Sequence, residues 1–373
     1  MGSPKGEMSV EQRVLTALRC RQPDRVPVFL YLNPYLDSEW YSKDPSYCEV
    51  LHACERYVDA IYDWGFSSGF FHTAAPLDEE TRQLAGDITE YVVHTPAGSI
   101  SSRSKVNWCG GGTIKRWISE PHDVERLLSI PYAPPRPDLK SVLQARKAMP
   151  DKWVVQLTFE DPMCCVGLID EMTLALWTIE RRDLLRALLD VAFERIQNEL
   201  KYCLDRGAGP VYYFNGPEYA LPPLMSPRDF EEFVVEYDKR LVDLVHSYAG
   251  NYVIMHSHGK VGKFLERFAS IGIDGLNVLE PPPIGDTVLS DAKRRIGDRV
   301  CLIGNIQYDD LARGAEEEVE RLVVDAIEEG AEGGGFILSP CASPYERPLP
   351  QKAARNMIRY LEVARRIGSY QGR

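Results

Sequence analysis

The chain has 373 residues, of which 44% are hydrophobic and 26% are charged, and 55 acidic against 43 basic residues give a formal net charge of −12. This composition is ordinary for a globular protein and excludes a disordered, collagen-like or coiled-coil chain. Proteins that bind nucleic acid normally carry a basic face, so the acidic balance argues against that class. Small-molecule chemistry remains, or a protein partner with a basic docking patch.

Neither a membrane segment nor a signal peptide is expected. No run approaches the roughly 18–20 consecutive apolar residues of a membrane helix, and the opening MGSPKGEMSVEQR lacks an apolar core. The nine cysteines follow no regular spacing and form no CxxC pair, which favours reduced thiols and a cytoplasmic location. We expect residues 1–8 to be flexible.

Eight short apolar runs, rich in β-branched and aromatic residues, predict β-strands. They are Arg25–Leu32, Gly65–Phe71, Trp153–Phe159, Pro210–Asn215, Tyr252–His256, Gly275–Leu279, Val300–Ile306 and Gly335–Ser339. Helical patterns lie between them. The clearest are Leu184–Leu204, Pro227–Tyr248, Val261–Ile271, Glu316–Gly330 and Gln351–Ile367.

Strand and helix alternating eight times predict a single (β/α)₈ barrel over residues 1–373, with a doubly wound open sheet as the alternative. Residues 87–118 interrupt the repeat. They contain two runs of alternating polarity joined by Pro96, Ala97 and Gly98, which predict an inserted β-hairpin. We expect this hairpin to lie over one mouth of the barrel.

The active site of such a barrel lies at the C-terminal ends of the strands, so the polar residues that end each run are candidates. We predict that His72 and Asp161 handle protons or substrate as catalytic residues. The residues predicted to contact substrate are Tyr31, Asn33, Asn215, Glu280, Asn305 and Gln307.

The most distinctive local motif is His256-Ser257-His258-Gly259 at the end of the fifth predicted strand. Residues two apart on a strand point to the same side, and neutral imidazole is a common zinc ligand. Cys341 after the eighth strand and Glu218 after the fourth could complete the ligand set. The alternative is that the histidines bond loop backbone and the cysteine is a small buried apolar residue.

Several segments together resemble the uroporphyrinogen decarboxylase superfamily over roughly residues 9–367. They are QPDRVPV, HSHGKVGKFLERFASIGIDGLNVLEPPPIGD, KRRIGDRVCLIGNIQ and GGGFILSP. The resemblance implies a (β/α)₈ barrel, in agreement with the strand pattern. It covers two branches, the decarboxylases and the corrinoid-dependent methyltransferases.

The methyltransferase branch is the closer of the two. In the decarboxylases, arginines after the first strand hold a substrate with many carboxylates, whereas FLYLNPYLDSEW here contains none. In the methyltransferases, an HxC motif after the fifth strand and a Cys after the eighth bind zinc. The resemblance therefore implies His256 and Cys341 as ligands, with His258 in place of the first Cys and Glu218 as an additional ligand.

The function implied is a zinc-dependent methyltransferase that moves a methyl group from a small methylated substrate, such as a methoxylated aromatic, to a corrinoid carried by a partner protein. Two alternatives stay open. One is a metal-free decarboxylase or lyase acting on a small acid, and the other is a non-catalytic protein that binds a corrinoid or tetrapyrrole. For the oligomeric state, a homodimer is the statistical default.

Overall fold

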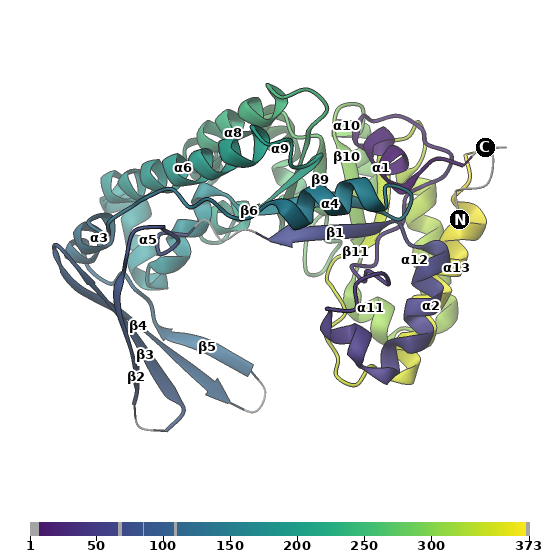
Figure 1. Cartoon of the computed structure of the whole chain (residues 1–373). Helices are drawn as coiled ribbons and strands as arrows, with labels where there is room; N and C mark the ends of the chain where they lie inside the picture. The colour runs from purple at the N-terminus through teal and green to yellow at the C-terminus, as the bar shows by residue number, and fades with distance from the viewer. Residues whose placement is uncertain (1–6, 66–68, 85, 108–109, 371–373) are drawn as a thin grey trace.

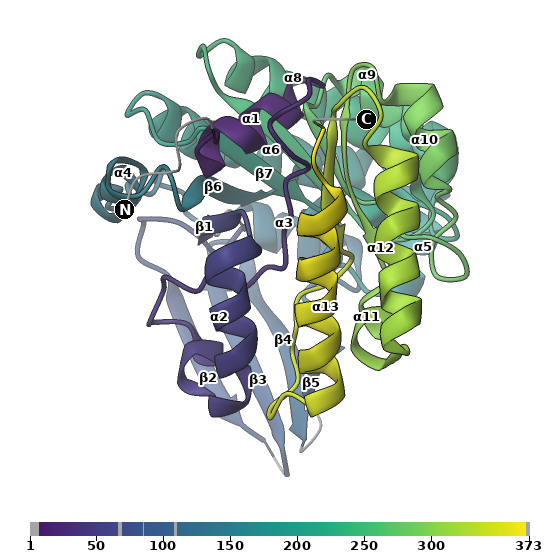
Figure 2. The same cartoon turned by 90° about the vertical axis from the view of Figure 1, so that its right-hand side faces the viewer.

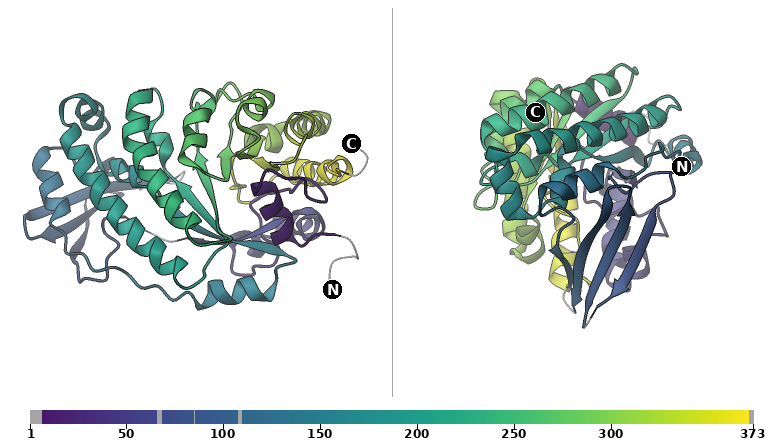
Figure 3. Two further views of the ribbon diagram at one scale, coloured as in Figure 1. Left: turned by 90° about the horizontal axis from the view of Figure 1, so that it is seen from above. Right: turned by 90° about the vertical axis from the view of Figure 1, so that its left-hand side faces the viewer.

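The computed structural model describes residues 7–65, 69–84, 86–107 and 110–370. Seven parallel strands form one curled sheet with helices along its outer side (Figures 1 and 3). In sheet order the strands are β1 (Ala60–Gly65), β6 (Trp153–Glu160), β7 (Val211–Asn215), β8 (Tyr252–Ser257), β9 (Gly275–Val278), β10 (Cys301–Ile306) and β11 (Phe336–Pro340).

An extended segment around Val28 occupies the eighth position, between β11 and β1. Val28 pairs in parallel with Leu338 of β11, and its carbonyl accepts the backbone N–H of Asp59 at 2.8 Å. Eight parallel backbone segments therefore surround the interior, and the predicted barrel is confirmed.

Two of the predicted strands need correction. Arg25–Leu32 is not a regular strand, because Pro27 has no N–H, the Val28 N–H donates to the Asp59 carboxylate at 2.9 Å, and Tyr31 adopts φ +57°. The second strand is β1 rather than Gly65–Phe71. Residues 66–68 lie outside the described residues, and the segment that follows them is a bend and turn.

The helices agree closely with the predicted patterns. Their bounds are α1 (Val10–Leu18), α2 (Cys48–Tyr57), α3 (Pro121–Leu128), α4 (Lys140–Ala148), α5 (Glu171–Glu180), α6 (Arg182–Leu204), α7 (Pro227–Phe230), α8 (Glu236–His246), α9 (Leu265–Ile271), α10 (Leu289–Ile296), α11 (Tyr308–Arg313), α12 (Glu316–Gly330) and α13 (Gln351–Ile367). A π-helical turn, Glu231–Val235, joins α7 to α8. Within the described residues, every helix is too short or too polar to cross a bilayer.

The inside of the barrel is filled at its N-terminal end. Val14 and Leu18 of α1 belong to the same buried cluster as the inward-facing Val154, Ile254 and Ile303 of the strands. A second, larger cluster lies between the strands and the surrounding helices. Because α1 covers the N-terminal end, the polar side chains gather at the opposite mouth.

The insertion after β1 is larger than the predicted hairpin. It is an antiparallel sheet of β2 (Asp78–Gln83), β3 (Ile88–Thr95), β4 (Gly98–Asn107) and β5 (Gly110–Lys115), with β3 and β4 forming the predicted pair. Its base packs on α3, and its far end extends away from the body of the molecule (Figures 1 and 2). That the sheet covers a mouth of the barrel stays a prediction. Residues 1–8 were predicted to be flexible, and residues 1–6 of that segment lie outside the described residues.

Candidate active site at the mouth of the barrel

A hydrogen-bonded network connects the ends of three adjacent strands. His256 of β8 has its Nδ1 2.6 Å from the Tyr213 hydroxyl of β7 and 2.8 Å from Oδ1 of Asn277 on β9. The Tyr213 hydroxyl donates to the same Oδ1 at 2.7 Å. On the other side, the Asn277 amide donates to the Tyr31 hydroxyl and to the Ile303 carbonyl, both at 3.1 Å.

This network sets the protonation of His256. Because the Asn277 amide nitrogen donates to a carbonyl, its Oδ1 is the acceptor facing His256, and the single Tyr213 proton is already used on it. His256 therefore carries its proton on Nδ1 and leaves Nε2 as an acceptor. Burial lowers the pKa of His256 to about 4, so the ring is neutral at neutral pH.

The pKa of His258 is shifted in the opposite direction to that of His256. The Nδ1 of His258 lies 3.1 Å from Oε1 of Glu280, whose other oxygen accepts the Gly259 N–H at 2.6 Å. The hydrogen bond to Glu280 raises the pKa of His258. Burial would raise the pKa of Glu280, but the bonds from His258 and Gly259 hold it below its usual value. The His256 and His258 rings lie 4.7 Å apart at 85°, so a neutral acceptor and a protonatable donor are neighbours.

The two other predicted metal ligands are placed differently. Cys341 is buried and its thiol donates to the Val278 carbonyl at 3.7 Å. Burial raises the pKa of that thiol well above its ordinary value. Burial also raises the pKa of Glu218, whose Oε2 has no hydrogen-bond partner among the described residues. No three potential ligands converge anywhere in the described part of the chain. As placed, the four residues do not fit a zinc site.

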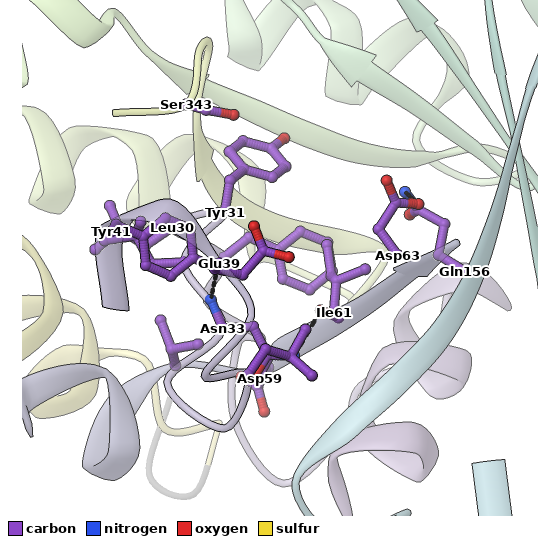
Figure 4. Close-up of a pocket in the computed structure, with 15 residues that line it drawn as sticks. Leu30, Tyr31, Asn33, Glu39, Tyr41, Asp59, Ile61, Asp63, Gln156 and Ser343 are labelled. Atoms are coloured by element: carbon purple, nitrogen blue, oxygen red, sulfur yellow. Dashed lines mark hydrogen bonds between the residues drawn. The ribbon is translucent and has the colours of Figure 1, made fainter. Parts of the chain in front are cut away.

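A cavity of about 270 Å³ opens beside Tyr31 (Figure 4). Figure 4 shows Tyr31 and Ser343 on one side and Asp63 and Gln156 across from them. The Asp63 carboxylate accepts from the Thr158 hydroxyl at 2.6 Å and from the Gln156 amide at 3.2 Å. Burial nevertheless raises the pKa of Asp63.

Asn33 also lines this cavity, but its side chain is used to hold the turn. Its amide donates to the Ile61 carbonyl at 2.9 Å, and its Oδ1 accepts the Tyr35 N–H at 3.0 Å. The Tyr41 hydroxyl accepts its backbone N–H. Asn33 therefore positions the segment that presents Tyr31, and its predicted contact with substrate stays a prediction.

A second cavity, of about 350 Å³, is lined by both predicted catalytic residues, His72 and Asp161. His72 Nδ1 lies 3.3 Å from Oε1 of Glu199, which is buried on α6. Burial raises the pKa of Glu199 to about 8, an effect that Arg195 opposes. The structure thus brings His72 and Asp161 to one wall although they are far apart in the sequence.

Asp161 lines this cavity but is only 1% exposed. Its Oδ1 accepts the Cys164 N–H at 3.0 Å, and its neighbour Asp238 of α8 is equally buried. Burial, together with Asp238 and Glu218, raises the pKa of Asp161 well above normal, and burial raises that of Asp238 to about 8. Two neighbouring buried acids with raised pKa values favour a protonated form over a pair of charges. A Cβ at Gly216 would lie 1.9 Å from Asp161 Oδ1, so only glycine fits there.

The remaining predicted contacts have less defined roles. Asn215 contributes its backbone carbonyl, which accepts from the Asp161 N–H at 2.7 Å and the Cys164 thiol at 3.1 Å. Asn305 is the last residue but one of β10 and is partly exposed. Gln307 precedes α11, and its Nε2 is buried without a hydrogen-bond partner among the described residues. Their contact with substrate stays a prediction.

Tyr213, Asp63 and Asp238 are among the residues of the site that were not predicted. Tyr213 lies two residues before Asn215 on β7, so strand alternation could have placed it on the same side. Asp63 was missed because the second strand was predicted too late in the chain. Asp238 comes from the helical layer, where no strand-end rule applies.

The family described as uroporphyrinogen decarboxylase (URO-D) matches residues 165–358, slightly more than half of the chain. The chain belongs to this family. Curated uroporphyrinogen decarboxylases from Pseudoalteromonas translucida (29% identical over 158 residues) and Prochlorococcus marinus (31% over 162 residues) are similar to it. Each match covers 42% of the relative and 42% or 43% of this chain, so the alignment spans about two fifths of these URO-D relatives.

Among solved structures, a methyltransferase from Methanosarcina mazei has the same fold, with a TM-score of 0.61 at 19% identity. The superposition covers 96% of this chain and 99% of that one. The likeness extends to the part of the chain outside the URO-D match and shows that the fold is shared over nearly the whole length of the chain.

Proposed function

We propose that this URO-D family member is an enzyme that transfers a methyl group from a small methylated substrate, with His258 as the proton donor to the leaving group. The observation that carries the proposal is the pair of histidines at the mouth. His258 is held by Glu280 in a state that favours its charged form, and the neutral His256 lies 4.7 Å away, measured between ring centroids.

The chemistry follows from this geometry. Nδ1 of His258 faces Glu280, and the side chain is 43% exposed, so Nε2 is the atom available to a substrate. As the bond between the methyl carbon and the donor oxygen breaks, its electron pair stays on oxygen, which takes the proton from His258 Nε2. The methyl carbon forms its new bond with the acceptor's electron pair. Nε2 of His256 accepts a hydrogen bond that orients the substrate.

The lining of the two cavities supports a small substrate without many negative charges. No Lys or Arg is found among their described lining residues, whereas Asp63 and Glu160 each line one. A substrate with several carboxylates needs cationic partners. A neutral methoxylated aromatic makes no such demand.

The zinc ion and the corrinoid stay predictions, and the mechanism above uses neither. Elemental analysis of chain purified without chelator tests the metal directly, on the wild type and on His258→Ala and Cys341→Ala. About one zinc per chain that both substitutions remove would support the predicted ligand set. A wild type without metal would overturn it and leave the acid–acceptor pair as the catalytic apparatus.

Activity is tested with methoxylated aromatics and reduced cobalamin by measuring methylcobalamin and the demethylated product together. We expect His258→Gln to lower the rate about 10²–10⁴-fold, and Glu280→Gln to move the alkaline limit of activity to lower pH. His246→Gln is the matched control. His246 also pairs with a carboxylate, since its Nε2 lies 2.8 Å from Asp274, but this pair is away from the mouth. Full activity of His258→Gln, or no turnover of any methylated donor, contradicts the proposal.

A further inference from the structure

A groove of about 500 Å³ lies in the helical layer, between α4 and the end of α6. Four cations line this basic groove: Lys140 and Lys147 of α4, Arg136 in the connector before α4, and Arg206 two residues after α6. Asp138 is the single acid among its described lining residues. The charge of the groove is therefore opposite to that of the chain as a whole, which has 55 acids against 43 bases.

The acids nearest in the sequence are engaged elsewhere. Asp138 accepts the backbone N–H of Lys140 at 2.9 Å, at the start of α4. Asp205, next to Arg206, pairs with Lys201 at 2.8 Å. Across the parts of the chain that the structure describes, none of the four cations forms an ion pair, so their charges are available to a ligand.

The two arginines are held in place with part of each guanidinium group left over. Both lie over the Tyr202 ring of α6, with Arg206 3.7 Å and Arg136 4.9 Å from its centroid. One nitrogen of each guanidinium group also donates to a backbone carbonyl of its own segment. Arg136 opposes the raised pKa of the buried Glu199 without forming an ion pair with it. The N–H groups that remain form a fixed fork, which suits the oxygens of a phosphate group.

The lysines come from one face of α4. Lys140, Leu143, Gln144 and Lys147 all line the groove, and their spacing of three, four and seven residues places them on one stripe of the helix. The buried Val142 and Ala145 anchor α4 to the core instead. Long, flexible lysine side chains at both ends of the stripe can therefore converge on an anion between them.

We propose that the basic groove binds a small molecule that carries two phosphoryl groups. A phosphate monoester carries about −1.5 to −2 charges at neutral pH, so two such groups match the excess of four cations over one acid. The volume is typical of small-molecule sites, which span about 300–1,000 Å³. Because both guanidinium groups lie over the Tyr202 ring, the groove recognises charge rather than a stacked base. It lies apart from the histidine pair, so the proposal is independent of the proposed reaction.

Isothermal titration calorimetry of the full chain with inorganic pyrophosphate tests the proposal, with orthophosphate as the comparison. We expect pyrophosphate to bind more tightly, and Lys147→Gln and Arg206→Gln each to raise its dissociation constant at least about tenfold. Arg146→Gln is the matched control, because Arg146 is on the same helix but lies 3.9 Å from Glu11, outside the groove. Thermal melting shows whether the variants remain folded, and Lys147 is exposed, so its substitution leaves the core intact.

Chemical acetylation followed by mass spectrometry locates the anion. We expect pyrophosphate to slow the acetylation of Lys140 and Lys147 but not that of Lys239, which is exposed on α8. A wild type that does not bind pyrophosphate, or that binds orthophosphate equally well, overturns the proposal. Binding that Lys147→Gln and Arg206→Gln leave unchanged also overturns it. So does binding to vesicles that contain phosphatidylserine without binding to pyrophosphate, which would assign the groove to a lipid surface.

Discussion

At the scale of single residues, the mouth of the barrel separates two chemically identical side chains. His256 is surrounded by Tyr213 and Asn277, which fix its proton on Nδ1 and keep it neutral. His258, two residues later, faces a carboxylate and is more exposed. The difference comes from neighbours on β7 and β9, so it is a property of the assembled barrel.

The first prediction concerns the pair of His258 and Glu280. We expect Glu280→Gln to lower the pKa of His258, because the hydrogen bond that raises it loses its charge. NMR titration of the imidazole protons measures the change. The pKa of His246, which Asp274 raises by the same kind of contact, should stay where it is. An unchanged pKa for His258 would show that Glu280 does not set its charge.

The same pair makes stability depend on pH. The stabilisation that His258 contributes is fully present below 6.5, its pKa in the unfolded chain, and is lost as pH rises through the raised pKa of the folded chain. The contribution of Glu280 is present above 4.5 and is lost as pH falls through the lowered pKa. The two overlap between pH 4.5 and 6.5, where Glu280→Gln should cost the most stability in urea unfolding.

The second prediction concerns Asp161 and Asp238. Both have raised pKa values, so between about pH 4 and 8 the folded chain holds more protons than the unfolded chain, and this pair makes stability fall as pH rises. We expect Asp238→Asn to flatten that slope, because the amide donates to an ionised Asp161. Asp238→Ala should cost about 1–3 kcal/mol by leaving a buried acid unpaired. Urea unfolding at pH 5.5 and 8 separates the variants, and equal slopes in wild type and Asp238→Asn would show that Asp238 does not contribute to the pH dependence of stability.

At the scale of elements, the inserted sheet packs on the body of the molecule at its base, against α3. Val93 and Ile100 are buried in the same cluster as Val124 and Leu127 of α3, whereas Val106, farther along β4, is 61% exposed. The sheet therefore owes its attachment to a few apolar contacts at its base.

The third prediction follows from that attachment. Ile100→Ala should destabilise the chain by about 2–5 kcal/mol and should raise the hydrogen exchange of β3 and β4 more than that of the barrel strands. Val106→Ala, on the same strand, should change stability by no more than about 0.5 kcal/mol. If hydrogen exchange in β3 and β4 is the same in the two variants, α3 does not anchor the sheet.

At the scale of the whole molecule, the barrel is closed by an ionic tie rather than by a regular strand. The buried carboxylate of Asp59 pairs with Arg13 of α1 at 2.7 Å and with Arg25 at 2.6 Å, and accepts the Val28 N–H. One side chain thus connects the helix that plugs the N-terminal end, the closing segment and the start of β1.

The fourth prediction tests this tie. We expect Asp59→Asn to lower the free energy of unfolding by about 3–5 kcal/mol, because the buried Arg13 and the partly buried Arg25 lose their shared partner. Chemical denaturation measures the loss, and Glu80→Gln, which removes an exposed ion pair with Arg82, should leave stability unchanged. A small effect of Asp59→Asn would show that hydrophobic packing alone closes the barrel.

The sequence by itself determined the class of fold, six of the eight barrel segments and the placement of the longer helices, because apolar runs and helical periodicity are local signals. It also placed His256, His258 and Glu280 at strand ends, and therefore at one mouth. The shifted second strand was missed because Asp63 interrupts its apolar run and its partners, Thr158 and Gln156, are distant in the sequence.

Only the tertiary structure decided how these residues are charged and which of them meet. Proton positions on His256 and His258 depend on Asn277 of the neighbouring strand and on Glu280 just after that strand. The pKa of Asp161 depends on Asp238 from a helix behind it. Cys341 shows the same limit, because it directly follows a strand as predicted, yet its thiol donates to the Val278 carbonyl. Desolvation and hydrogen bonding across elements set these properties, and neither has a signature in local sequence.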